Sequence, residues 1–88
     1  MPSSRSAPVR TLVGLPMFNE EETVASVVVR CLDHVTDVLC VDDGSSDASS
    51  RLAARAGAIV HHHRANRGYG AAIRTIFRIA REMDVDRL

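Results

Sequence analysis

The chain has 88 residues, of which 45% are hydrophobic and 25% are charged, and its 11 basic and 11 acidic side chains give a formal net charge of zero. This composition indicates one small globular domain and excludes both a disordered chain and the basic surface that a nucleic-acid-binding protein needs. No apolar stretch approaches the roughly 18 residues of a membrane span, and the first residues lack the apolar segment of a signal peptide, so we expect a cytoplasmic protein.

The N-terminal part of the sequence predicts a leader followed by a strand. Residues 1 to 8 are rich in serine and proline and have no periodicity, which indicates a disordered leader. The domain then begins at Val9 and extends over residues 9 to 88. The apolar run from Val9 to Leu15 predicts a first strand, which we expect Pro16 to end.

The first helix is expected directly after this strand. Asn19, followed three residues later by Glu22, has the pattern of a capping box, so we place the helix start at Asn19. Valines and a cysteine then recur at helical spacing, and we expect the helix to end near Asp33.

Two further strands and two further helices follow in alternation. Residues 37 to 41 form a buried run typical of a strand, Ser46 or Asp47 is expected to cap a second helix, and Gly57 is expected to end it in a left-handed conformation. Residues 58 to 61 predict a third strand. The third helix follows the loop 63 to 68, and its expected apolar face comprises Ala72, Ile73, Ile76, Phe77, Ala80 and Met83.

This alternation predicts an α/β fold in which a Rossmann-like parallel sheet is flanked by helices. All strands of such a sheet deliver their carboxyl ends to the same edge, and ligands bind outside that edge. We therefore expect three loops to meet there, comprising residues 16 to 20, 42 to 47 and 63 to 70.

Two of these loops carry residues suited to a polar ligand. Asp42 and Asp43 follow a buried strand, so one carboxylate can face a ligand while the other binds loop amides; an ordinary turn closed by Gly44 explains the same pattern. Residues 66 to 70 read N-R-G-Y-G, in which the glycines allow close backbone approach and the next helix offers unpaired N–H groups to an anion. The third loop alone is a weak signal, because it matches neither a dinucleotide fingerprint nor a Walker loop.

Taken together, three segments resemble those of the family 2 glycosyltransferases. They read L-P-M-F-N-E-E at 15 to 21, V-D-D-G-S-S-D at 41 to 47 and H-R-A-N-R-G-Y-G-A-A at 63 to 72. The closest likeness is to the polyprenyl-phosphate or dolichol-phosphate mannosyl and glucosyl synthases. The resemblance implies that residues 9 to 88 are the N-terminal, nucleotide-binding portion of a GT-A fold.

The resemblance also implies which residues hold the donor nucleotide. Pro16 and Phe18 would line the base pocket, with Phe18 standing where a tyrosine is usual, and Glu20 would accept hydrogen bonds from the ribose. Val41 would lie beside the base and Asp43 would accept a proton donor on the base edge. The loop beside the diphosphate and sugar would comprise Asn66, Arg67, Gly68 and Gly70.

The implied reaction transfers mannose or glucose, with inversion, from a GDP- or UDP-sugar to a polyprenyl phosphate, with Mg²⁺ or Mn²⁺ offsetting charge on the departing diphosphate. In the family an Asp-x-Asp at the end of the next strand holds this metal, and that strand is missing here. We therefore assign no catalytic residue and no metal ligand within this chain, and expect the 88 residues alone to bind no metal and to be inactive. The longer protein would act at the cytoplasmic face of the membrane.

Three other patterns are interpreted as structural. Adjacent side chains of the histidine run 61 to 63 point to opposite faces of an extended segment, so the run is assigned to the entry of a loop. Residues 84 to 86 spell D-V-D but follow a helix directly, so they are assigned to the helix end and the approach to a further strand. The arginines of the third helix fit a solvated face with an Arg78 to Glu82 pair.

Two alternatives remain. The chain could be a non-catalytic module that binds nucleotide or a partner protein. A receiver-type signalling domain also places paired acids after a strand, but it requires a lysine, and this chain has none. In either case a three-stranded sheet leaves an exposed edge, through which we expect self-association.

Overall fold

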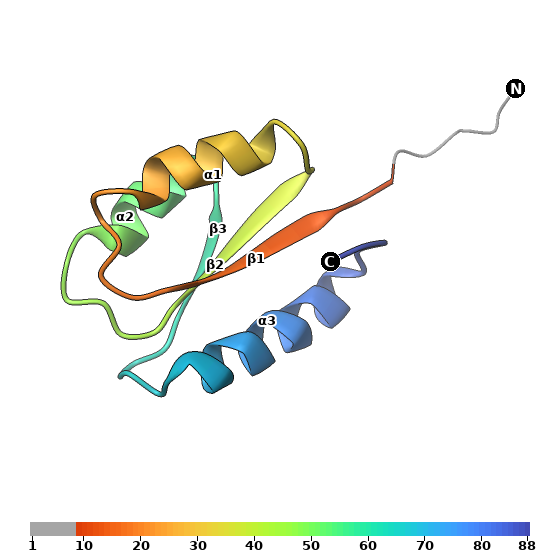
Figure 1. The fold of residues 1–88 in the computed structure, drawn as a ribbon. Coiled ribbons are helices and arrows are strands. Elements are labelled where there is room, and N and C mark those ends of the chain that lie inside the picture. The colour runs from red at the N-terminus through yellow and green to blue at the C-terminus, as the bar shows by residue number, and fades with distance from the viewer. Residues whose placement is uncertain (1–8) are drawn as a thin grey trace, which may run out of the picture.

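The computed structural model describes residues 9–88, so the expected leader at residues 1 to 8 lies outside the described residues. Strands and helices alternate through this part of the chain (Figure 1). The elements are β1 (Leu12–Met17), α1 (Val24–Leu32), β2 (Asp37–Asp42), α2 (Ser49–Arg55), β3 (Ile59–His62) and α3 (Tyr69–Met83). The predicted order of elements is confirmed.

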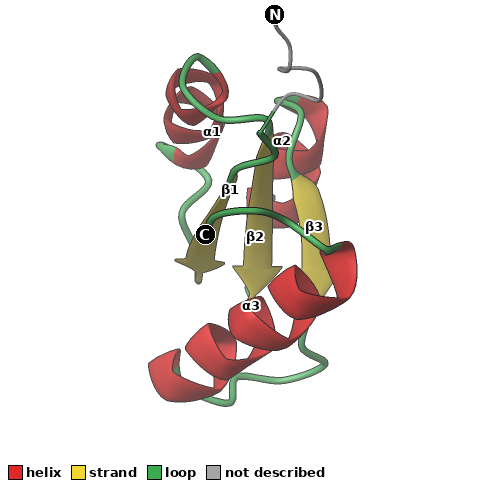
Figure 2. Ribbon diagram, turned by 90° about the vertical axis from the view of Figure 1, so that its right-hand side faces the viewer, coloured by secondary structure: helices red, strands yellow, loops and turns green. Residues whose placement is uncertain are grey.

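The three strands form one parallel sheet in the order β1-β2-β3, with helices on both faces. Figures 1 and 2 show α1 and α2 on one face of the sheet and α3 on the other. Side chains of the central strand alternate accordingly: Val38 and Cys40 pack in the cluster with α1 and α2, whereas Leu39 and Val41 pack in the cluster with α3. The predicted Rossmann-like α/β fold is confirmed.

The first strand extends past Pro16 to Met17, contrary to the prediction that Pro16 would end it. The N–H groups of Asp37 and Asp43 donate to the carbonyls of Thr11 and Met17, so the odd-numbered residues of β1 bond to β2. The nitrogen of Pro16 therefore lies on the open side of an edge strand, where its missing N–H removes no bond of the sheet.

The first helix begins at Val24 instead of Asn19, so the predicted cap is wrong. Asn19 has a left-handed backbone with φ of 52°, and its side-chain Oδ1 accepts a hydrogen bond from the Ser46 N–H at 2.9 Å. Asparagine tolerates this conformation well, and its amide is used to join two loops rather than to cap a helix. The helix ends at Leu32 with Asp33 as its C-cap, as predicted.

The second helix begins at Ser49, two or three residues after the predicted caps. The carboxylate of Asp47 nevertheless accepts the Ser49 N–H at 2.9 Å, so it stabilises the approach to the helix. Gly57, just beyond the helix end, has φ of 113° as expected of a left-handed stop. The third strand runs one residue later than predicted.

The third helix places Ala72, Ile76 and Ala80 in the core, but Phe77 is 56% exposed. Phe77 borders a shallow apolar groove between α3 and the free edge of β1. None of the described helices is both long and apolar enough to cross a lipid bilayer.

The D-V-D segment after α3 turns the chain back toward β1. Asp84 is a left-handed C-cap, the Asp86 carboxylate accepts the Arg10 N–H at 2.7 Å, and Arg87 forms an isolated parallel bridge with Thr11. The predicted helix end is confirmed, and the approach to a further strand stays a prediction.

Candidate functional site

Three loops converge at the carboxyl ends of the strands, and together they form the surface that we call the rim: residues 16 to 20, 42 to 47 and 63 to 70. The Asp43 N–H donates to the Met17 carbonyl at 2.8 Å, and the Asn19 N–H donates to Ser45 Oγ at 2.9 Å. The Gly68 N–H donates to Asp43 Oδ2 at 2.9 Å. The predicted meeting of three distant segments is confirmed.

The glycine of the second loop allows it to lie against the third loop. Gly44 has φ of 82°, and a Cβ atom at this position would lie 2.7 Å from the backbone nitrogen of Asn66. An L side chain would be strained by the backbone angle and blocked by the neighbouring main chain. Gly44 is therefore required for the contact between the two loops.

Asp42 is directed into its own loop. Its Oδ1 accepts the Ser45 N–H at 2.8 Å, and its Oδ2 accepts the hydroxyl of Ser50 at the start of α2. Burial raises the pKa of Asp42, but the hydrogen bonds from Ser45 and Ser50 outweigh that effect and leave the pKa below its ordinary value of 3.8. Asp42 is thus an ionised residue that closes the turn, which matches the turn interpretation of the acid pair.

Asp43 is directed toward the third loop and is only 5% exposed. Its Oδ1 lies 2.8 Å from His63 Nδ1 and accepts the Arg67 N–H at 2.8 Å, in addition to the Gly68 bond on Oδ2. The hydrogen bond from His63, followed by that from the Arg67 amide, holds the pKa of Asp43 below 3.8 despite burial. The second acid of the pair therefore joins the two loops as a carboxylate.

His63 links Asp43 to the third helix. Its Nε2 lies 2.9 Å from Thr75 Oγ1, and both residues are 7% exposed. The sequence interpretation, which assigned the histidine run to a loop entry, missed this buried link. Thr75 was the available signal, because it is a polar residue placed among the buried positions of an amphipathic helix.

A cleft of about 430 Å³ opens beside this linked pair. The residues that line it are Pro16, Met17, Phe18, Glu20, Asp43, Asn66, Gly68, Tyr69 and Ala72. Six of them were predicted from the sequence; Met17, Tyr69 and Ala72 were not. The exposed rings of Phe18 and Tyr69 and the carboxylate of Asp43 border this cleft. A cleft of this size and lining is suited to a flat polar ligand.

Three predicted site residues do not line the cleft. Val41 is fully buried in the core under α3, so its predicted contact with a base is not supported. Arg67 contributes its backbone N–H to Asp43 and has an exposed side chain, and Gly70 lies in the first turn of α3. A strand residue next to an acid pair is easily taken for a surface residue, but its side chain points away from the rim toward α3.

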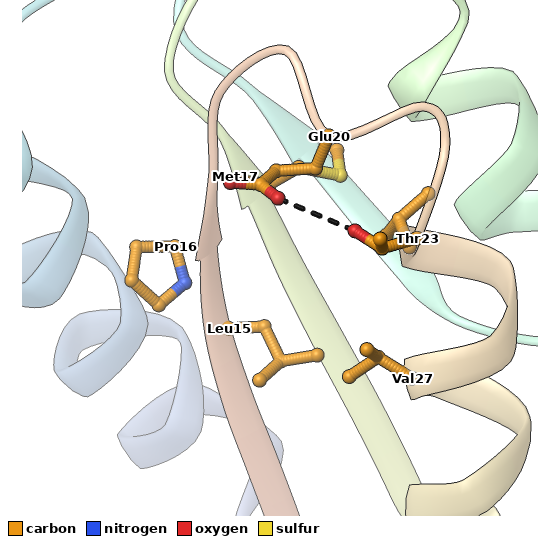
Figure 3. A pocket seen from close by; sticks show the side chains of 7 residues that line it. Leu15, Pro16, Met17, Glu20, Thr23 and Val27 are labelled. Atoms are coloured by element: carbon orange, nitrogen blue, oxygen red, sulfur yellow. Dashed lines mark hydrogen bonds between the residues drawn. The ribbon is translucent and has the colours of Figure 1, made fainter.

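Glu20 lies between the cleft and a second, smaller hollow of about 200 Å³ at the start of α1. Figure 3 shows this hollow, with Leu15 and Val27 facing each other across it and the Glu20 carboxylate turned toward Thr23. The Thr23 hydroxyl donates to Glu20 Oε2 at 3.4 Å, and the Glu20 N–H donates to Ser49 Oγ at 2.7 Å. The backbone N–H and the carboxylate of Glu20 thus both form hydrogen bonds, while the residue stays exposed.

The described residues contain no group of three or more histidine, cysteine, aspartate or glutamate side chains placed to hold a metal ion. Asp43 and His63 are hydrogen-bonded to each other, and the Asp86 carboxylate accepts a hydrogen bond from the backbone N–H of Arg10. The donor set of this part of the chain therefore does not fit a metal centre.

Comparison with known proteins gives matches over the same segments. Residues 12–82, which include the whole rim, match the family described as glycosyl transferase family 2. An uncharacterized protein of Methanocaldococcus jannaschii is 38% identical over 64 residues, which make up 72% of this chain and 26% of that protein. The chain thus spans about a quarter of the length of this relative.

Two solved structures are similar in fold. Mannosyl-3-phosphoglycerate synthase from Rubrobacter xylanophilus has a TM-score of 0.55 and 27% identity, over 61% of this chain and 19% of that one. The crystal structure of a mycobacterial protein has a TM-score of 0.62 and 29% identity, over 74% of this chain and 25% of that one.

Proposed function

Because the chain belongs to glycosyl transferase family 2, we propose that it forms the nucleotide-sugar-binding part of an inverting glycosyltransferase. The donor is a GDP- or UDP-sugar carrying mannose or glucose, and the acceptor of the longer enzyme is a polyprenyl phosphate. The observation that carries the proposal is the cleft at the rim, since six residues assigned to the donor nucleotide line it together.

The cleft offers the contacts that a nucleotide needs. Phe18 is 46% exposed and presents a ring on which a base can stack. The exposed carboxylate of Glu20 accepts hydrogen bonds from ribose hydroxyls, and the largely buried carboxylate of Asp43 accepts a hydrogen bond from the base edge through its free position. The first turn of α3, which begins at Tyr69, presents backbone N–H groups without an intrahelical partner to a diphosphate, and no acidic residue lies in this turn.

The chain's own residues bind and orient the donor in this proposal. The sugar lies beyond the diphosphate, toward Asn66 and the end of the third loop, where an acceptor oxyanion attacks the anomeric carbon from the opposite side. Mg²⁺ or Mn²⁺, which stabilises the departing diphosphate in such reactions, has no ligand set among the described residues, so no step is assigned to it here. We expect negligible sugar transfer by these 88 residues alone.

Nucleotide titration tests the proposal. We expect UDP or GDP to bind the chain in a calorimetric or NMR titration, and Phe18→Ala to weaken binding about tenfold, through loss of stacking worth about 1–2 kcal/mol. Phe18 is an exposed residue, so its replacement should leave the fold intact. Asp43→Ala should abolish binding, although it also removes the partner of His63.

The matched control is Asp33→Ala, which changes an exposed acid at the end of α1, away from the rim. Its affinity should equal that of the unmodified chain. If neither nucleotide binds a folded chain, the proposal fails and a structural or partner-binding role takes its place.

A further inference from the structure

The carboxylate of Asp43 already holds three hydrogen bonds before any ligand is bound. Oδ1 has two partners, His63 Nδ1 and the Arg67 N–H, both at 2.8 Å. Oδ2 has one partner, the Gly68 N–H at 2.9 Å. An ionised carboxylate offers about four lone-pair positions, two on each oxygen. Oδ1 is therefore filled, and Oδ2 retains one free position.

His63 is fixed in the orientation that fills Oδ1. Because an ionised carboxylate only accepts hydrogen bonds, Nδ1 must carry the proton of this hydrogen bond. Nε2 lies 2.9 Å from Oγ1 of Thr75, whose hydroxyl can donate or accept a hydrogen bond. Both side chains are buried, so water does not offer the ring an alternative partner. The contact with Asp43 thus places the proton on Nδ1, and the contact with Thr75 holds the ring in this orientation.

The Asp43 carboxylate also lines the cleft that we assign to the donor nucleotide. A nucleotide base that contacts this carboxylate can donate to one free acceptor position, which is on Oδ2, and to none on Oδ1. Uracil presents one ring N–H between two carbonyl groups, which satisfies a single acceptor. Guanine presents two adjacent N–H donors, and these pair with a carboxylate only when both oxygens are free to accept.

We infer that His63 is a specificity-determining residue, which fills Oδ1 of Asp43 and so makes the cleft select a uridine nucleotide over a guanosine nucleotide. This inference rests on the proposed function and narrows it to UDP-sugar donors. It is based on the contacts of His63 and the third-loop amides with the Asp43 carboxylate, and on the contact of His63 with Thr75.

Competition between two nucleotides tests the inference directly. We expect UDP to bind the unmodified chain about tenfold or more tightly than GDP, because GDP would leave a donor unpaired in the cleft. Equal affinities, or tighter binding of GDP, would overturn the inference while leaving the proposed function intact. Failure of both nucleotides to bind would overturn both.

Two variants of His63 separate specificity from folding. His63→Asn keeps an N–H donor near the position of Nδ1, so we expect it to retain the preference for UDP. His63→Leu removes the donor and frees a position on Oδ1, so we expect the preference to fall to about threefold or less. A preference that is the same in both variants contradicts a role for His63 in specificity.

A spectroscopic measurement decides the point if His63→Leu does not fold. The ¹⁵N shifts of the His63 ring in the unmodified chain should show a protonated Nδ1. Observation of an unprotonated Nδ1 in the unmodified chain would contradict the inference.

Discussion

Polar contacts between distant segments stabilise both ends of the sheet. The side chains that form them are exposed at the amino end and include buried ones at the carboxyl end, where the rim lies. At the amino end, Arg10 Nε lies 3.0 Å from Asp37 Oδ2, and the Arg10 side chain is 44% exposed. At the rim, Asp43, His63 and Thr75 are at most 7% exposed. Exposed pairs contribute little because water replaces them, whereas a buried polar group left without a partner costs about 1–3 kcal/mol. The rim, which we propose as the nucleotide-binding surface, is therefore the end of the fold that we expect to tolerate substitution less well.

Removing the buried histidine should give the largest effect. His63→Ala should lower the free energy of unfolding by about 3 kcal/mol, because Asp43 and Thr75 both lose a partner and a cavity is left. Urea denaturation followed by circular dichroism measures this value. The control is His62→Ala at the neighbouring residue, whose side chain is 63% exposed; its loss should be about 0.5 kcal/mol or less. Equal losses would remove the contrast between buried and exposed contacts.

The second-largest effect is expected from acid, which should lower the free energy of unfolding through Asp42 and Asp43 at the rim. The folded pKa values of Asp42 and Asp43 lie below 3.8, so below that pH the unfolded chain takes up protons more readily than the folded one. Their contribution to stability is thus complete above about pH 5 and is lost as the pH falls through 3.8 toward the folded pKa values. Urea denaturation at a series of pH values should show this decline, and Asp43→Asn should make it shallower. A free energy of unfolding that stays constant over the same range would contradict the assignment.

The smallest effect is expected at the amino end. Arg10→Ala should lower the free energy of unfolding by about 0.5 kcal/mol, since the pair with Asp37 is exposed. Its nucleotide affinity should be unchanged, because no residue at this end lines the cleft. A loss comparable to that of His63→Ala would show that exposure does not decide the sensitivity of the two ends.

The sequence predicted the architecture well because its patterns reflect backbone geometry. Buried runs such as residues 37 to 41 and the spacing of Ala72, Ile76 and Ala80 follow the periods of strand and helix, so the sheet, its helices and the convergence of three loops could be anticipated. The six cleft residues that lie in those loops followed from the same topology together with the resemblance of the motifs.

The misplaced details depend on contacts between residues far apart in the sequence. Asn19 looks like a helix cap locally, but its amide bonds Ser46 in another loop. Pro16 looks like a strand end, but it occupies the open side of an edge strand. Whether Val41 faces the rim or the core depends on α3, and the partnership of His63 with Thr75 likewise requires α3 to be in place. Local patterns carry none of this information.

The row of hydrogen-bond donors on the open side of β1 is interrupted at Pro16. The Leu12 N–H on that side donates to the Arg87 carbonyl at 2.9 Å, and by alternation the Gly14 N–H points the same way, whereas Pro16 has no N–H to offer. Because the Leu12 N–H is already used within this chain, another strand that pairs with this edge would find a donor at Gly14 and none at Pro16. Such a strand would separate from β1 at Pro16, which lines the cleft that we propose for the nucleotide, so extension of the sheet would leave the cleft open.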